Sequence, residues 1–343
     1  MAGCYIYLYE NKRFMKKNIL IIGSLMLLSS LLFMQCNGDK KKQPVRHETV
    51  EAPAYDADSA FAFVKAQTDF GPRVPNSEAH EQCARYLQSS LYKYCDTVIL
   101  QKFTATAYNG TKLKGTNIIG SFAPGNPRRV VLSSHWDSRH VADHDPDPAN
   151  RNRPIDGAND GASGVGVLLE LARQLSLKSP GIGVDIVLFD AEDYGAPESM
   201  HAPEGEWWGL GSQYWAENPH VADYRADYGI LLDMVGDANA KFRYEHFSSY
   251  YAQDILTKVW SAASRLGFGR TFVAERTHPI TDDHYYVNTL GNVRMIDIIH
   301  QDDYTGTGFP PTWHTLNDNI DHIDKNTLST VGKTLLYVIY EEK

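Results

Sequence analysis

The sequence predicts an α/β fold, a single domain with a central mixed, mostly parallel β-sheet flanked by helices. Short runs rich in valine, isoleucine and leucine recur along the chain, and segments with helical spacing of apolar residues lie between them. Strands that alternate with helices favour one sheet between helical layers. Several runs are apolar at successive positions, which is typical of central strands covered on both faces.

Five strands and three helices follow from these patterns. The strands are expected at residues 117–121, 129–134, 184–190, 229–235 and 293–299. The helices are expected at residues 78–93, at about 165–175 after the glycine-rich segment 157–161, and at about 328–338. Asp324 is a good N-cap for the last helix, because its carboxylate can accept a hydrogen bond from the first turn.

Residues 1–36 have the features of an export signal. Lys16 and Lys17 precede a mostly apolar run at residues 19–34, as in a secretory signal peptide, with Met15 as an alternative natural start. A membrane-spanning helix normally needs about 20 apolar residues, so a retained anchor is the less favoured interpretation. Cys36 stands where a bacterial lipoprotein carries its lipidated cysteine. We expect an exported, lipid-anchored protein of the periplasm or cell envelope that touches the membrane only here.

The remaining chain is expected to divide into a polar tether at residues 37–55 and a catalytic domain at residues 56–343. The formal net charge of −9 disfavours nucleic-acid binding, which usually needs a basic face. Acidic residues gathered at one site could instead attract a metal ion or a cationic amine. Cys83 and Cys95 are expected to remain free thiols, because a continuous helix would hold them about 18 Å apart.

Side chains that bind metals or protons follow several of the predicted strands. They are His135, Asp137, Asp190, Glu192, Asp193, Asp233, His300 and His314, together with Asp160 at the start of a helix. In open α/β sheets such side chains meet beyond the carboxyl ends of the strands. Clustered carboxylates and imidazoles either bind a cation or shift one another's pKa. Zinc suits a mixed oxygen and nitrogen set, and a catalytic zinc has three protein ligands and one open position.

The order of these motifs resembles that of the zinc-dependent exopeptidases of the aminopeptidase superfamily. The similar features are His135-x-Asp137, Asp160 in a glycine-rich helix start, Glu192 with an acidic neighbour, Asp233 and the late His314. Residues 70–75, Phe-Gly-Pro-Arg-Val-Pro, also resemble the N-terminal signature of these enzymes. The resemblance implies a zinc exopeptidase-like fold from about Ala57 to the end of the chain.

Three segments resemble the glutaminyl cyclases within this superfamily, and the bacterial members most closely. Residues 281–284 (Thr-Asp-Asp-His) have an aspartate where aminopeptidases commonly carry serine. Residues 313–315 (Trp-His-Thr) place tryptophan directly before the histidine, and residues 232–236 (Leu-Asp-Met-Val-Gly) are similar to the cyclase segment. The resemblance implies a glutaminyl-peptide cyclotransferase, which converts the N-terminal glutamine of peptides and proteins to pyroglutamate and releases ammonia.

The resemblance also implies a role for each matching residue. One zinc ion per chain would be held by Asp160, Asp193 and His314. Glu192 would be the general acid/base, and Asp233 and Asp282 would be the carboxylates that handle the substrate amine. The implied substrate-binding residues are Trp313, Trp207 or its neighbour Trp208, and Asp297. Two departures stand out, because Asp193 is one methylene shorter than the glutamate of animal cyclases and Asp297 replaces their pocket histidine.

Two other functions compete with this interpretation. A two-zinc aminopeptidase is the main alternative, because His135 and Asp233 match the second-metal ligands of that family. A lipid-tethered binding protein without catalysis is less favoured, because the implied base and metal ligands are all present. Metal analysis and the product formed from a glutamine-initiated peptide distinguish these functions.

Overall fold

The computed structural model describes residues 50–197 and 199–342. The expected signal segment and residues 37–49 of the expected tether lie outside the described residues. None of the helices in the described part of the chain is long and apolar enough to cross a membrane. The first helix, α2, begins at Ala57 and is capped by the Asp56 carboxylate, which accepts hydrogen bonds from the backbone N–H groups of Asp58 and Ser59.

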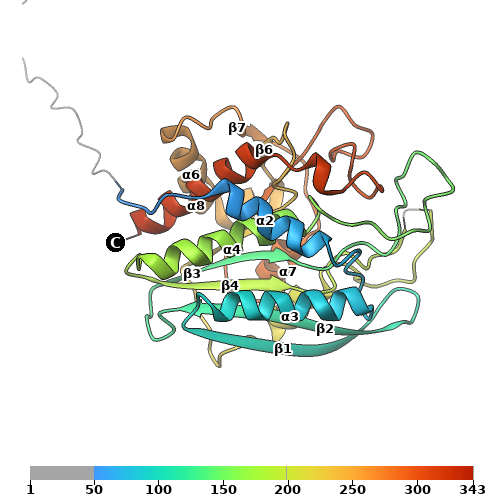
Figure 1. Ribbon diagram of the computed structural model, residues 1–343, viewed down its shortest axis with the longest axis horizontal. Coiled ribbons are helices and arrows are strands. Elements are labelled where there is room, and N and C mark those ends of the chain that lie inside the picture. The colour runs from blue at the N-terminus through green and yellow to red at the C-terminus, as the bar shows by residue number, and fades with distance from the viewer. Residues whose placement is uncertain (1–49, 198, 343) are drawn as a thin grey trace, which may run out of the picture. The chain divides into compact units, whose positions relative to one another are not determined.

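A six-stranded sheet forms the centre of the domain, with the strand order β1-β2-β4-β3-β5-β8 (Figure 1). The strands are β1 (Thr97–Thr106), β2 (Lys112–Phe122), β3 (Arg129–His135), β4 (Gly183–Phe189), β5 (Tyr228–Asp233) and β8 (Met295–Ile299). β4, β3, β5 and β8 run parallel, whereas β2 pairs antiparallel with both β1 and β4. The predicted mixed, mostly parallel sheet is therefore confirmed.

The five predicted strands correspond to β2, β3, β4, β5 and β8, and the three predicted helices also form. The helices are α2 (Ala57–Thr68), α3 (Glu78–Tyr92), α4 (Ala162–Leu177), α5 (Leu210–Glu217), α6 (His246–Arg265), α7 (Asp283–Leu290) and α8 (Lys325–Glu341), with a 3-10 turn η1 (Ile320–His322). Asp324 caps α8 as predicted, by accepting from the backbone N–H of Thr327. A separate pair, β6 (Phe242–Tyr244) and β7 (Phe272–Arg276), was not predicted.

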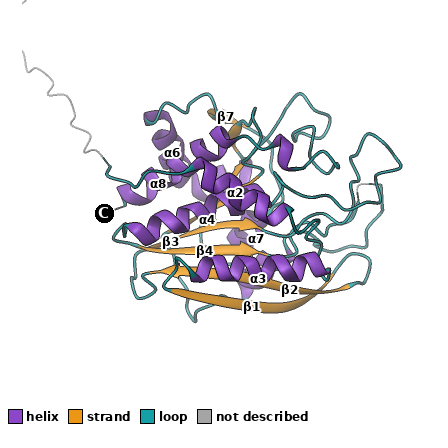
Figure 2. Cartoon of the chain, viewed as in Figure 1, coloured by secondary structure: helices purple, strands orange, loops and turns teal. Residues whose placement is uncertain are grey.

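Helices cover both faces of the sheet (Figure 2), and the alternation of side chains along each strand shows why. On β3, Val130 and Leu132 belong to a core cluster with α2, α4 and α8, whereas Val131 belongs to a second cluster with α5 and α7. On β5, Leu232 and Leu231 divide in the same way. Both faces are buried, so the strands are apolar at successive positions.

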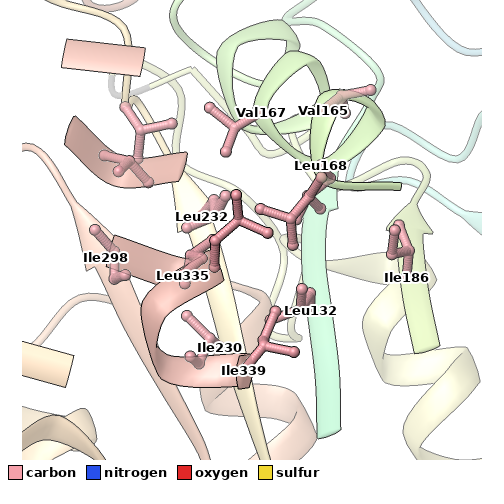
Figure 3. Close-up of a cluster of buried hydrophobic side chains, with 14 of the residues drawn as sticks. Leu132, Val165, Val167, Leu168, Ile186, Ile230, Leu232, Ile298, Leu335 and Ile339 are labelled. Carbon is pink, nitrogen blue, oxygen red and sulfur yellow. The ribbon is translucent and has the colours of Figure 1, made fainter. Parts of the chain in front are cut away.

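The larger cluster joins the sheet to α4 and α8 (Figure 3). Leu132, Ile230 and Ile298 point from three parallel strands toward Leu168 of α4 and Leu335 of α8, and all five are fully buried. Each such side chain contributes roughly 1.5–3 kcal/mol to stability relative to its exposed state. This packing fixes the positions of the strands, and therefore of the loops that follow their carboxyl ends.

The two cysteines of the described domain are free, as predicted. Cys83 lies inside α3 and is fully buried, and Cys95 is half-buried just beyond the end of that helix. Burial raises the pKa of each thiol to about 12, so both remain protonated and unreactive at neutral pH.

Candidate active site

A cavity of about 370 Å³ lies beyond the carboxyl ends of the parallel strands. It is lined by Asp160, Glu192, Asp193, Trp208, Asp233, Met234, His278, Pro279, Ile280, Thr281, Asp282, Ile299, Thr307, Phe309, Trp313 and His314. Seven of the nine residues predicted for the site are in this set; Trp207 and Asp297 are not. The lining combines a cluster of acidic groups with aromatic and aliphatic walls, which suits a ligand with a cationic end and a flat, uncharged body.

Asp160, Asp193 and His314 form one group that can hold a metal ion. Each offers one ligand atom, these atoms lie within 4.8 Å of one another, and all three residues are buried. His314 Nε2 is 3.4 Å from Asp193 Oδ1 and 3.7 Å from Asp160 Oδ2. Asp193 Oδ2 is buried and has no hydrogen-bond partner within the described chain. Two carboxylates and one imidazole fit a divalent ion of the zinc type.

His135 joins Asp160 to Asp233 in a second group of the same kind. Its Nε2 lies 3.0 Å from Asp160 Oδ1 and 3.2 Å from Asp233 Oδ1. Burial acts to lower the pKa of His135, but contacts with Asp137, Asp160 and Asp233 outweigh it and raise that pKa well above the usual value. The imidazole therefore lies within ion-pair distance of both carboxylates.

The backbone around these side chains adopts left-handed conformations that only a rigid surrounding maintains. Ala191 (φ 54°) and Met234 (φ 49°) are each adjacent to a predicted site residue, Glu192 and Asp233, and His314 (φ 54°) is itself a candidate metal ligand. Gly161, the residue after Asp160, has φ 91°, and a Cβ there would lie 2.8 Å from the Asp137 carbonyl oxygen. Gly161, and not Asp160, is the N-cap of α4.

Asp137 holds the segment that carries Glu192 and Asp193. Its carboxylate accepts the backbone N–H of Glu192 at 3.0 Å and that of Asp193 at 3.1 Å. Glu192 is buried, and this burial, followed by the negative charges of Asp193 and Asp282, raises the pKa of Glu192 well above its usual value. A carboxyl group with a raised pKa can hold and release a proton near neutral pH.

Asp233 and Asp282 lie in the cavity as a second acidic pair. Burial and the neighbouring Asp160 raise the pKa of Asp233 to about 7, and burial also raises that of Asp282. Asp282 is the N-cap of α7, and its Oδ2 atom is buried without a partner within the described residues. Two such carboxylates can receive a cationic amine or share protons.

Asp297 is located behind the cavity, on β8. It is fully buried, and burial, followed by the charges of Asp282, Asp233 and Glu245, raises its pKa well above the usual value. His284 separates two of these acids, because its Nε2 is 3.0 Å from Glu245 Oε2 and its Nδ1 is 3.6 Å from Asp297 Oδ2. Asp297 therefore contacts the groups behind the cavity and is not part of the cavity lining.

Trp313 and Trp208 form the aromatic walls. Trp313 stacks on His314 with ring centroids 3.6 Å apart, and Trp208 is nearly parallel to the same imidazole at 6.3 Å. Trp207, named in the sequence prediction, lies outside the lining. Its indole N–H donates to the Pro203 carbonyl oxygen, and its ring packs against a separate cluster that includes Leu210. Of the two neighbours, Trp208 is the one placed to contact a ligand.

Several residues that support the site were not predicted. Arg73, within the Gly-Pro-Arg segment, is fully buried and donates to the carbonyl oxygens of Trp136, Asp156 and Gly157. It thereby fixes the loop that leads to Asp160. Asp318, in a loop far along the chain, accepts the backbone N–H groups of Asn159 and Asp160. These contacts join distant segments, so the sequence marked the Arg73 segment only as a motif and did not indicate which loops either residue holds.

Arg139 and Asp143 form a further unpredicted contact beside the candidate metal ligands. The guanidinium of Arg139 donates to both oxygens of Asp143 at 2.8 Å and to Asp193 Oδ1 at 3.2 Å. Burial acts to raise the pKa of Asp143, but hydrogen bonds from Arg139 and His314 outweigh it and hold that pKa well below the usual range. The one usable signal was the arginine two positions after Asp137, close to the His135-x-Asp137 motif.

Known proteins similar to this chain include bacterial glutaminyl cyclases. The structure of Bacteroides thetaiotaomicron glutaminyl cyclase bound to N-acetylhistamine is 53% identical, with a TM-score of 0.83, and the match covers 85% of this chain and 100% of that one. A Zn-dependent exopeptidase from Parabacteroides distasonis is 52% identical, with a TM-score of 0.84 and the same coverage. The resemblance stated from the sequence is confirmed.

A curated relative and a family model give the same result. The glutaminyl-peptide cyclotransferase of Bothrops jararaca is 27% identical over 254 residues, which are 66% of this chain. The match spans 65% of the length of that relative. The model of Peptidase family M28 matches residues 117–339, which is more than half of the chain and contains every predicted site residue. This chain belongs to Peptidase family M28.

Proposed function

We propose that this chain is a zinc-dependent glutaminyl-peptide cyclotransferase that acts on peptides and proteins with an N-terminal glutamine. The observation that carries the proposal is the composition of one cavity. A metal-binding group, Glu192 and the acidic pair Asp233 and Asp282 all line it, together with aromatic walls. The similarity to the Bacteroides thetaiotaomicron glutaminyl cyclase supports the same activity.

The reaction closes a ring within one molecule, so orientation is its main requirement. The α-amine attacks the carbon of the side-chain amide, a new C–N bond forms, the old C–N bond breaks, and ammonia leaves. Glu192 takes a proton from the amine and returns one to the departing nitrogen. Asp233 and Asp282 hold the amine end, and Trp313 and Trp208 enclose the flat amide and exclude water.

Asp160, Asp193 and His314 would hold the zinc ion. When bound, the ion supplies positive charge that polarises the amide carbonyl. His135 fills the place between Asp160 and Asp233 by direct contact, which supports one ion per chain.

The test is product analysis with a peptide that begins with glutamine, using ammonia release and mass spectrometry. A product lighter by ammonia supports cyclisation. Release of free glutamine together with the shortened peptide would overturn the proposal in favour of a peptidase. A strong zinc chelator should abolish the activity, and added zinc should restore it.

A two-zinc aminopeptidase is the second candidate, because one observation favours it. His135, Asp160 and Asp233 form a group with metal-binding spacing that shares Asp160 with the first group. Two tightly held zinc ions per purified chain, measured by elemental analysis, would support this candidate.

We also propose that the protein is exported and anchored to the cell envelope by a lipid on Cys36, with no other membrane contact. The apolar run at residues 19–34 and the cysteine after it support this proposal. Mass spectrometry of the mature N-terminus tests it, because cleavage before Cys36 and an added lipid mass are both required. Substitution of Cys36 by serine should release the protein from the membrane fraction.

A further inference from the structure

We propose that Arg139 and Asp143 are positioning residues that together orient two of the three metal ligands, His314 and Asp193. The two ligands come from loops about 120 positions apart in sequence. Arg139 contacts Asp193 directly and reaches His314 through Asp143. The inference rests on the proposed metal site, and it assigns these two residues a role in metal affinity rather than in proton transfer.

The first half of the arrangement fixes the imidazole. Asp143 Oδ1 lies 3.2 Å from His314 Nδ1, on the side of the ring away from Asp160 and Asp193. A carboxylate at Nδ1 favours the tautomer with its proton there, which leaves the Nε2 lone pair free for a metal ion. Arg139 in turn holds both oxygens of Asp143 at 2.8 Å, so that carboxylate cannot rotate away from the imidazole.

The second half fixes Asp193. Arg139 Nη1 lies 3.2 Å from Asp193 Oδ1 and 3.3 Å from the carbonyl oxygen of the same residue. Side chain and backbone of the ligand are thus held by one donor group. The other carboxylate oxygen, Oδ2, is buried without a partner among the described residues. The guanidinium therefore fixes Oδ1, the oxygen that faces His314 Nε2 at 3.4 Å, and with it the orientation of the whole carboxylate.

The guanidinium of Arg139 is itself held in a buried position by its neighbours. Arg139 is 1% exposed, and its guanidinium carbon lies 4.8 Å from the centre of the Trp208 ring. Gly195 also contacts this guanidinium, because its carbonyl oxygen accepts a hydrogen bond from Arg139 Nη1 at 3.4 Å. A Cβ at Gly195 would lie 2.1 Å from the Trp208 ring, so a side chain there would displace that ring. A planar fork is required here, because lysine has no second edge with which to bridge Asp143 and Asp193.

The zinc dissociation constant, measured by competition with a chromophoric chelator on the full-length protein, tests the inference. We expect Arg139→Lys and Asp143→Asn each to weaken zinc binding about 10–100-fold, the usual effect of removing a group that orients a metal ligand. This readout does not depend on the reaction catalysed.

Arg129→Lys is the matched control. Arg129 is also a nearly buried arginine with a carboxylate partner, Asp185 at 2.8 Å, but it lies at the opposite end of β3. The Arg129→Lys variant should unfold at a lower temperature. Its zinc dissociation constant should stay within about twofold of that of the unsubstituted protein. Equal zinc affinity in the Arg139 variant and the unsubstituted protein would overturn the inference, as would an equal loss in the Arg129 variant.

Two further results remain decisive. If Arg139→Lys does not fold, Asp143→Asn is the deciding variant, because asparagine keeps the volume and one acceptor oxygen; unchanged zinc binding in it overturns the inference. If the unsubstituted protein binds no zinc, the proposed metal site fails and the inference with it. If all variants bind zinc with the dissociation constant of the unsubstituted protein, the proposed function stands and only the positioning role of Arg139 and Asp143 is overturned.

Discussion

Glu192 lines the cavity, and in the proposed reaction its carboxyl group serves both the attacking and the leaving nitrogen. Its backbone is held by Asp137, and its carboxyl is buried beside Asp193 and Asp282. The role assigned to it needs a group that changes protonation state during the reaction. A neutral side chain of the same shape should therefore keep the site intact and remove only the proton transfer.

Glu192→Gln should lower kcat for a glutamine-initiated peptide by about 10²–10⁴-fold, the usual contribution of a general acid/base. Zinc content and unfolding temperature should stay close to those of the unsubstituted protein. Continuous ammonia detection and elemental analysis measure both quantities. Glu81→Gln, on the exposed face of α3, is the control and should be unchanged; a Glu192 variant that keeps a third of the activity would contradict the assignment.

Asp297 provides a pH-dependent prediction about stability. Burial and the charges around it raise its pKa in the folded protein, so the folded state binds a proton that the unfolded chain has lost above about pH 4. This group therefore lowers the free energy of unfolding progressively as pH rises from about 4. Asp297→Asn removes that penalty, and the variant should be more stable at pH 8 than the unsubstituted protein, with a smaller difference at pH 4.

Urea unfolding followed by circular dichroism at the two pH values measures this difference. Asp185→Asn is the contrasting control, because Asp185 is equally buried but is paired with Arg129 at 2.8 Å. Loss of that partner should destabilise the protein at pH 8. The prediction is contradicted if Asp297→Asn stabilises the protein less at pH 8 than at pH 4. That result would show that Asp297 does not lower the free energy of unfolding as pH rises.

At the scale of elements, the sequence predicted the parts of the fold whose burial is uniform. β3, β4, β5 and β8 are buried at every residue, so apolar residues dominate each strand and often stand at successive positions. β1 was not predicted, because it is an edge strand that pairs only with β2 and nearly all of its residues are half-buried or exposed. α5 and α7 have only eight residues each, too short for a clear helical period.

The candidate site was likewise predictable only in part. Residues at the end of a strand or a few positions beyond it, such as Asp233 and Asp193, were found because the sheet places them at one edge. Arg139, Asp143 and Asp318 were missed, because their partners lie in loops brought together only by the folded sheet. Trp208 and Trp207 could not be separated, because adjacent residues in a loop have no fixed face.

The start of α4 carries a prediction about an element boundary. Gly161 has φ 91° and no space for a side chain, so Gly161→Ala should be less stable by about 1–3 kcal/mol and should bind zinc more weakly by displacing Asp160. Thermal unfolding and chelator competition measure the two effects. Gly110→Ala is the control, since Gly110 has φ 83° with open space around it. If both variants lose equal stability and neither loses zinc affinity, the lack of space between Gly161 and the Asp137 carbonyl oxygen does not position Asp160.

At the scale of the whole molecule, the site unites segments that are far apart in the sequence. The cavity includes residues from 160 to 314, and the core between the sheet, α4 and α8 holds their supporting strands together. A metal ion that bridges Asp160, Asp193 and His314 would therefore bind only the folded chain. Metal binding and global stability should be linked quantitatively, because any ligand of the native state alone shifts the unfolding equilibrium.

Zinc removal should lower the unfolding temperature, and titration of zinc into the metal-free protein should restore it. At a free concentration 100 times the dissociation constant, one site stabilises the native state by about 2.7 kcal/mol, or roughly 5–10 °C for a domain of this size. Differential scanning calorimetry and isothermal titration calorimetry measure the shift and the stoichiometry. Because His135 already bridges Asp160 and Asp233, binding should saturate at one equivalent. A second tight equivalent in the native protein, lost in His135→Ala, would show instead that this imidazole is a metal ligand and would favour the two-zinc peptidase.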